Sequence, residues 1–143
     1  MGFRADVRAA AVTLLEAYAT AATVKLQVYP GRPRTLYPPS AFVDGIREVV
    51  TYTAQLHQRV PIADVVLVHG TYDSRDTTEQ ADAFVDGFLE YVNDNPHAAG
   101  ANTTVAVTEV EDLPTFVSDW MAPADQKTYY ATRIALEGFA SSG

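Results

Sequence analysis

The chain contains no cysteine among its 143 residues, which excludes disulfide bonds, thiolate metal sites and cysteine nucleophiles together. It is also poor in basic residues: 10 lysines and arginines stand against 18 acidic residues, and the formal charge is −8. Tight binding to nucleic acid needs a dense basic patch, whereas Lys25 and Lys127 are the only lysines and the arginines are scattered. We therefore expect no specific nucleic-acid binding.

Long apolar runs are missing as well, and none approaches the roughly 20 residues that a membrane-spanning helix needs. Arg4 and Arg8 precede an alanine-rich stretch, as in a signal peptide, but Asp6 and Glu16 interrupt that pattern. The apolar residues of this stretch recur at helical spacing instead: Val7, Ala11, Leu14, Leu15 and Tyr18. The sequence therefore predicts an amphipathic helix over residues 3–22.

Motifs that carry catalysis or cradle phosphate are not found. The eight glycines form no Gly-rich loop, and no serine lies in the Gly-x-Ser-x-Gly elbow that a hydrolase with a His69-Gly70 turn would need. His69, Asp73 and Asp76 are residue types that bind metals, but they lack a metal-site spacing such as His-x-x-x-His. We therefore expect no enzymatic activity, no cofactor and no metal.

Residues 64–96 give the clearest structural signal. The aliphatic run 65–68 is typical of a strand buried on both faces. An apolar stripe at helical spacing follows it: Ala81, Phe84, Val85, Phe88, Leu89 and Val92. Asp76 and Thr77 are candidate caps for this helix. Its opposite face carries the acidic row Asp82, Asp86 and Glu90, which we expect to meet water, counter-ions or a basic partner.

The remaining elements follow from alternation and from turn residues. Residues 25–29, 46–58, 103–110 and 129–139 are predicted as strands, with Pro61 ending the second of these regions. A stiff proline-rich loop spans 30–39, and residues 111–128 are predicted to be irregular. The order of helix, three strands, helix and two strands favours one α+β domain over residues 1–143. We expect a mainly antiparallel sheet of about four or five strands with both helices on one face.

Two loops carry candidate interaction residues. Arg32 and Arg34, held between prolines, are suited to bind a carboxylate-bearing surface, or they are the solvated side chains of a stiff loop. Phe116, Trp120 and Met121 are residue types enriched at interface cores, and the alternative is a loop folded back over the protein's own core. The sequence leaves both pairs of alternatives open.

Four stretches share a layout with a known family. They are the N-terminal helix, Val-Tyr-Pro-Gly-Arg-Pro-Arg at 28–34, the strand and helix at 66–94, and Tyr-Tyr-Ala-Thr-Arg-Ile-Ala-Leu-Glu-Gly at 129–138. This layout covers nearly the full chain. It resembles the tail terminator (tail-completion) proteins of long-tailed bacteriophages, which include the minor tail protein U of lambdoid phages. It contains no fixed motif, so no residue role is carried over from the family.

The resemblance implies a structural virion protein, assembled in the host cytoplasm. In that family six copies form a ring that caps the tail tube and joins it to the head–neck connector, and no catalytic residues belong to it. Partners would be further copies of the chain, the tail tube protein and the connector, with DNA passing through the ring. A charge of −8 on every copy repels DNA and suits free passage.

Other functions stay open on the sequence. One alternative is a neighbouring neck or head–tail connector protein of similar build. A second is a small α+β enzyme that uses His69 and Asp73 as acid and base. A third is an adaptor that binds a partner through residues 111–128. We favour the structural protein because no nucleophile, metal cluster or phosphate loop is present.

Overall fold

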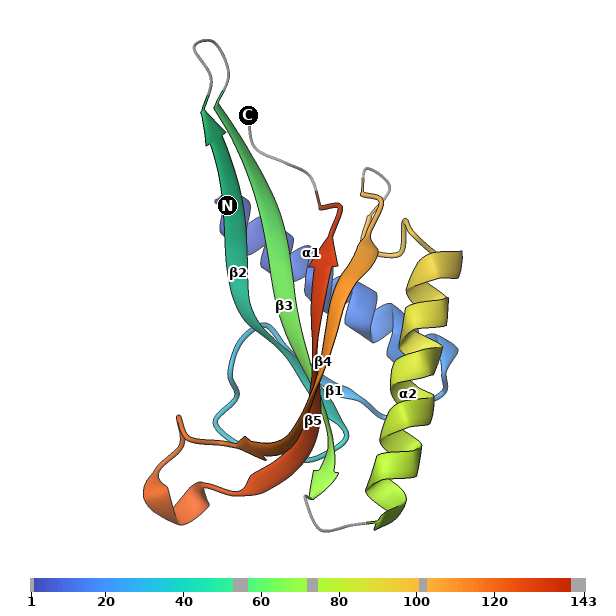
Figure 1. Cartoon of the computed structure of the whole chain (residues 1–143), viewed down its shortest axis with the longest axis vertical. Coiled ribbons are helices and arrows are strands. Elements are labelled where there is room, and N and C mark those ends of the chain that lie inside the picture. Colours follow the sequence, from blue (N-terminus) through green and yellow to red (C-terminus); the bar gives the residue numbers. More distant parts are fainter. Residues whose placement is uncertain (1, 53–56, 72–74, 101–102, 140–143) are drawn as a thin grey trace.

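A computed structural model describes residues 2–52, 57–71, 75–100 and 103–139. The elements in chain order are α1 (Phe3–Ala21), β1 (Gln27–Tyr29), β2 (Ser40–Tyr52), β3 (His57–Thr71), α2 (Arg75–Asp94), β4 (Ala106–Val117), the short 3₁₀ helix η1 (Pro123–Asp125) and β5 (Thr128–Glu137). This order confirms the α+β class (Figure 1).

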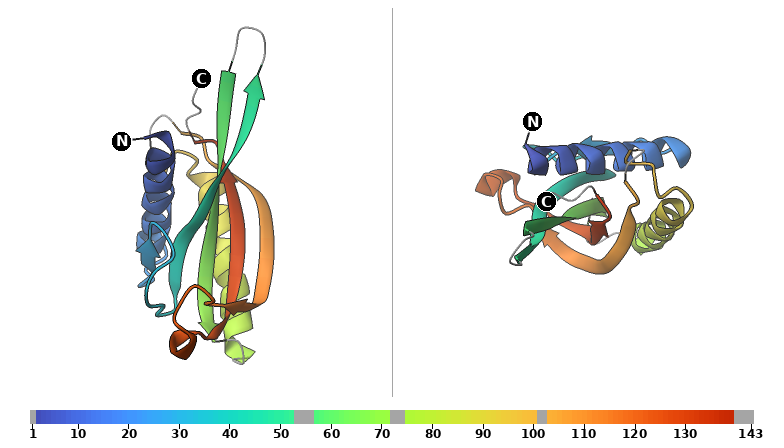
Figure 2. Two further views of the ribbon diagram at one scale, coloured as in Figure 1. Left: turned by 90° about the vertical axis from the view of Figure 1, so that its left-hand side faces the viewer. Right: turned by 90° about the horizontal axis from the view of Figure 1, so that it is seen from above.

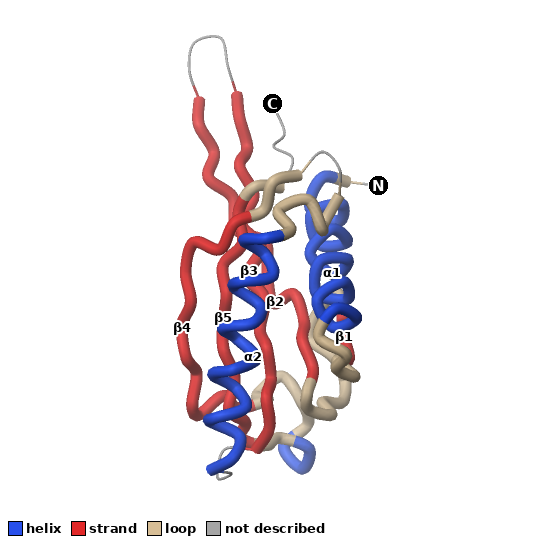
Figure 3. Tube along the Cα trace, turned by 90° about the vertical axis from the view of Figure 1, so that its right-hand side faces the viewer, coloured by secondary structure: helices blue, strands red, loops and turns tan. Residues whose placement is uncertain are grey.

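The five strands form one sheet in the order β1-β2-β3-β5-β4. All neighbouring pairs are antiparallel except β1 and β2, which are parallel. Both helices lie on the same side of the sheet, as expected (Figure 3). β5 follows β4 in the chain but lies between β3 and β4, so β4 is an edge strand.

Two hydrophobic cores occupy the two faces of the sheet. The larger core packs α1 and α2 on one face of the strands, and its largest fully buried side chains include Leu14, Leu15, Val65, Leu67, Phe88 and Ile134. The smaller core lies on the opposite face beneath the loops and consists of Leu36, Phe42, Val66, Val68, Tyr129 and Ala131. Residues 65–68 are at most 1% exposed, which confirms a strand buried on both faces.

The two helices meet where Tyr18 of α1 contacts α2. Its hydroxyl donates to the carbonyl oxygen of Phe84 at 2.8 Å, and its ring packs edge-on against the rings of Phe84 and Phe88. A Cβ atom added at Gly87 would lie 2.7 Å from the Tyr18 hydroxyl. A glycine at this position therefore lets the helices approach closely.

Three boundaries predicted from the sequence are wrong. Residues 46–58 are not one strand, because β2 ends at Tyr52 and β3 begins at His57. Pro61 does not end a strand but pairs with Glu48 inside β3. Residues 111–128 are irregular only in part, since β4 continues to Val117. Residues 53–56 and the side chains of the proposed caps Asp76 and Thr77 lie outside what the structure describes.

Candidate interaction surfaces

A two-stranded arm projects from the sheet (Figures 1 and 2). It consists of residues 47–52 of β2 and 57–62 of β3, which pair from Arg47 with Ile62 to Tyr52 with His57. β3 pairs with β5 only from Ala63 onward, so the arm has no third strand. Such a hairpin is marginally stable alone in water.

The base of the arm is fastened to the start of α1. Glu48 accepts a hydrogen bond from Arg4 at 2.6 Å and another from Arg59 at 2.5 Å. Arg4 also donates to the carbonyl oxygen of Ile46, and the Arg59 guanidinium lies 4.9 Å from the centre of the Phe3 ring. The hydrogen bond from Arg59 lowers the pKa of Glu48; the bond from Arg4 adds to this and burial opposes it. This Arg4–Glu48–Arg59 clamp fixes the direction in which the arm points.

The arm exposes apolar side chains. Val49 is 53% exposed, Val50 41% and Tyr52 75%. Among the described residues, the other exposed large apolar side chains are Tyr37, Val110 and Val117. Five of these six therefore lie on the arm or on the edge strand β4. Val50 and Tyr52 lie on one face of the arm and Val49 on the other, so both faces of the arm offer exposed apolar side chains to a partner.

The proline-rich loop and the loop after β4 meet at the smaller core. Trp120 donates its indole N–H to the carbonyl oxygen of Pro33 at 2.9 Å and packs against Phe42 and Phe116. The Arg32 guanidinium lies 5.1 Å from the centre of the Trp120 ring. Of the two interpretations of the residue 116–121 region, the structure confirms the loop folded back over the protein's own core.

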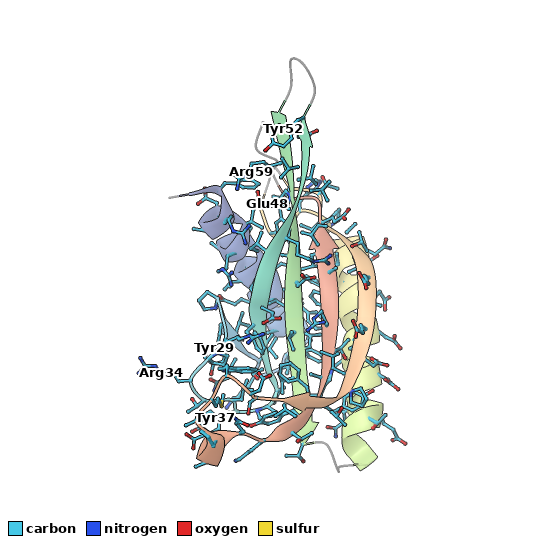
Figure 4. The ribbon with its side chains drawn as sticks, turned by 60° about the vertical axis from the view of Figure 1, so that its left-hand side comes forward. Tyr29, Arg34, Tyr37, Glu48, Tyr52 and Arg59 are labelled. Atoms are coloured by element: carbon cyan, nitrogen blue, oxygen red, sulfur yellow. The ribbon has the colours of Figure 1, made fainter. Side chains whose placement is uncertain are left out.

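The predicted interaction residues thus fall into separate groups. Met121, like Phe116 and Trp120, is partly buried against the smaller core. Arg32 forms an ion pair with Asp44 at 2.7 Å. Arg34 makes no hydrogen bond or ion pair within the described ranges, and Figure 4 shows it pointing away from the body. The acidic row Asp82, Asp86 and Glu90 is exposed on α2, as expected.

A charged hollow of about 330 Å³ lies on the face of the sheet that carries no helix. Arg47 binds Asp64 through two hydrogen bonds, of 2.6 and 2.9 Å. Arg133 lies 3.9 Å from Asp44 and 3.8 Å from Glu111. Each arginine of this hollow already faces a carboxylate, so the hollow does not offer a free cation to a phosphate group.

This hollow was not predicted from the sequence. Its only available signal was the occurrence of Asp64 and Arg133 in otherwise apolar strands. Such charges on one strand face indicate a polar cluster, but their partners come from β2 and β4 and depend on the register.

His69, the candidate base of the enzyme alternative, lies between the sheet and α2. One ring nitrogen, Nε2, is 2.9 Å from the Thr132 hydroxyl, and the ring contacts Phe84 and Tyr130. Burial lowers the pKa of His69 to about 4, and the charge of Asp82 opposes this shift. Its proposed partner Asp73 lies outside the described residues.

Among the described residues, no group of three or more histidine, aspartate or glutamate side chains is arranged to hold a metal ion. No helix in the same ranges is long and apolar enough to cross a membrane. Comparison with protein-family models and with curated proteins finds no match.

Proposed function

We propose that the protein is a structural component that assembles with copies of itself into a ring. On the basis of the resemblance to tail terminator proteins, we propose that this ring is the tail terminator of a long-tailed bacteriophage. It caps the tail tube, joins it to the head–neck connector and lets DNA pass. The observation that carries the proposal is the fastened arm with its exposed Val49, Val50 and Tyr52, because it displays apolar surface away from the body.

The charges of the chain support the same proposal. At −8 per copy, a ring repels the DNA that slides through it. The acidic row Asp82, Asp86 and Glu90 is exposed and either lines the channel or faces a basic neighbour. The arginines of the charged hollow are paired with carboxylates, so they do not retain a passing phosphate backbone.

The geometry of His69 favours this proposal over the enzyme alternative. A histidine with its pKa near 4 is neutral at pH 7 and takes up a proton only weakly, which makes it a poor general base there. The imidazole of His69 contacts Thr132, Phe84 and Tyr130 and contributes to the packing of α2 on the sheet.

Sedimentation velocity over a concentration series, with negative-stain images of the largest species, tests the proposal. We expect a discrete oligomer, ring-shaped with an open centre. Val49→Asp should shift the distribution toward the monomer because it places a charge on the exposed arm, whereas Thr13→Asp on the exposed face of α1 should leave the distribution unchanged. A monomer at every concentration, or an oligomer indifferent to Val49→Asp, would contradict the proposal.

A further inference from the structure

The outer edge of β2 is protected over its first half. β1 pairs with residues 40–42. Arg8 then donates to the carbonyl oxygen of Val43 at 2.8 Å, and Arg4 donates to that of Ile46 at 2.6 Å. Beyond Ile46, the described part of the chain places no strand beside this edge. An unprotected strand edge is a template for a further strand.

Main-chain groups alternate along a strand, so the Ile46 carbonyl identifies which residues face outward. Since Ile46 points its carbonyl at Arg4, the amides of Glu48 and Val50 face the same outer side. Glu48 pairs with Pro61. Because the main-chain groups of Glu48 face outward, this is a non-hydrogen-bonded pair, and a proline is tolerated there. Pro61 therefore removes one amide donor from the opposite edge of the arm, which makes the β2 edge the better template for strand addition.

The second open edge is β4, at the far side of the sheet. Its register shifts between Val107 and Glu109 and again between Leu113 and Phe116, which leaves residues 109–113 as a regular run. This run exposes Val110 by 42% and carries Glu109, Glu111 and Asp112. This run of five residues is close in length to the six residues 47–52 of the arm.

The charges of the two edges decide which edges pair. The arm carries Arg47 and Arg59, each in an ion pair with a carboxylate of its own chain, whereas all the charged side chains of the β4 run are acidic. Two β4 edges would bring carboxylates together, and like charges directly opposite are destabilising. An arm against β4 brings opposite charges together.

We propose that the outer edge of β2 in the arm of one copy forms a continuous sheet with β4 of the next copy. This inference rests on the proposed function, since it specifies how the proposed ring is joined. The two edges are different surfaces of one molecule, so the contact is heterologous. Repeating a heterologous contact around a closing rotation gives a ring rather than a two-fold dimer.

Cysteine trapping tests the pairing directly, because the chain has no cysteine of its own. Val50→Cys and Val110→Cys are prepared as separate proteins and treated with a short bis-maleimide, alone and mixed. We expect a cross-linked dimer in the mixture and none with either protein alone. Val50→Cys mixed with Thr13→Cys supplies the background.

A backbone variant tests strand addition independently of side-chain proximity. Val50→Pro removes an outward amide and leaves the β2–β3 hydrogen bonds, so it should weaken association about tenfold or more, whereas Val50→Thr keeps the amide and should associate normally. Hydrogen exchange of residues 57–60 checks that the Val50→Pro arm stays paired.

The outcomes separate the inference from the proposed function. A ring that forms with no Val50–Val110 cross-link, with Val50→Cys linked to itself, or with unchanged association of Val50→Pro overturns the arm-to-β4 pairing and leaves the ring standing. A monomer with no cross-link in any mixture overturns both.

Discussion

The body of the molecule and its arm belong to the same sheet but differ in how far their apolar side chains are buried. In the body, the central part of β3 is covered on both faces, and Val65, Val66 and Leu67 are fully buried. In the arm, two strands of the same sheet expose Val49, Val50 and Tyr52. Hydrophobic burial therefore stabilises the body, whereas the Arg4–Glu48–Arg59 clamp orients the arm. Changes in the body should affect unfolding, and changes in the arm should affect association.

The largest effect should come from the body. Phe88→Ala removes a fully buried ring between α2 and the sheet and should lower the free energy of unfolding by about 3–5 kcal/mol. Urea denaturation measures this change. The matched arm variant Val49→Ala, at a half-exposed site, should unfold within about 0.5 kcal/mol of the parent protein. Equal losses from both variants would contradict the division between body and arm.

Acid should weaken the body through His69. Its folded pKa of about 4 lies below its unfolded value of about 6.5, so between these values the unfolded chain binds more protons. Stability should therefore rise with pH across that window, by roughly 3 kcal/mol in total, and be lost as the pH falls. Urea midpoints measured from pH 4 to 7 check this. His69→Gln should flatten the curve, and an unchanged slope would exclude His69 as its source.

A smaller effect is expected where the helices cross. Gly87→Ala places a methyl group against the Tyr18 hydroxyl and should destabilise the body by about 1–2 kcal/mol. Tyr18→Phe loses a hydrogen bond to Phe84 worth about 1 kcal/mol. The double variant should be less destabilised than the sum of the two, because removing the hydroxyl makes room for the methyl group. Additive losses in this double-mutant cycle would indicate that the two sites do not touch.

The smallest effect on global stability should come from the clamp. Glu48→Gln removes the carboxylate shared by the exposed Arg4 and the partly exposed Arg59, so amides in 47–52 and 57–62 should exchange faster while those of the body do not change. Because the folded pKa of Glu48 is lowered, its contribution is complete above the ordinary glutamate pKa and is lost as the pH falls through the lower value.

Glu16→Gln on α1 is the control for the clamp. It changes the net charge of the protein by the same amount as Glu48→Gln, but at a site away from the arm. Unchanged exchange of the arm amides in Glu48→Gln, measured by mass spectrometry, would show that the hairpin holds its direction without the clamp.

Local patterns predicted much of the body. The stripe from Val7 to Tyr18 and the run 65–68 depend on neighbours in the sequence, and the structure confirms both as elements of the core. The arm was missed because alternating residues continue through both of its strands, so the pattern contains no break at Tyr52. Pro61 was misread because a proline is tolerated where a strand has an open edge, and edges are set by tertiary pairing.

The candidate surfaces were predictable only in part. The acidic row on α2 follows from helical spacing and is exposed as expected. Whether Trp120 faces a partner or the protein's own core depends on Pro33, 87 positions earlier, whose carbonyl accepts its indole N–H. The charged hollow likewise joins side chains from four strands, and no local pattern specifies such a register.

The position of β5 has a consequence for synthesis on the ribosome. β5 leaves the ribosome after β1 to β4, yet it lies between β3 and β4 in the sheet. Until residues 128–137 have emerged, β4 has no strand to pair with and one side of β3 is bare. A nascent chain or a truncated product therefore lacks an ordered β4 edge, so in the proposed assembly only copies translated through β5 would be competent to join.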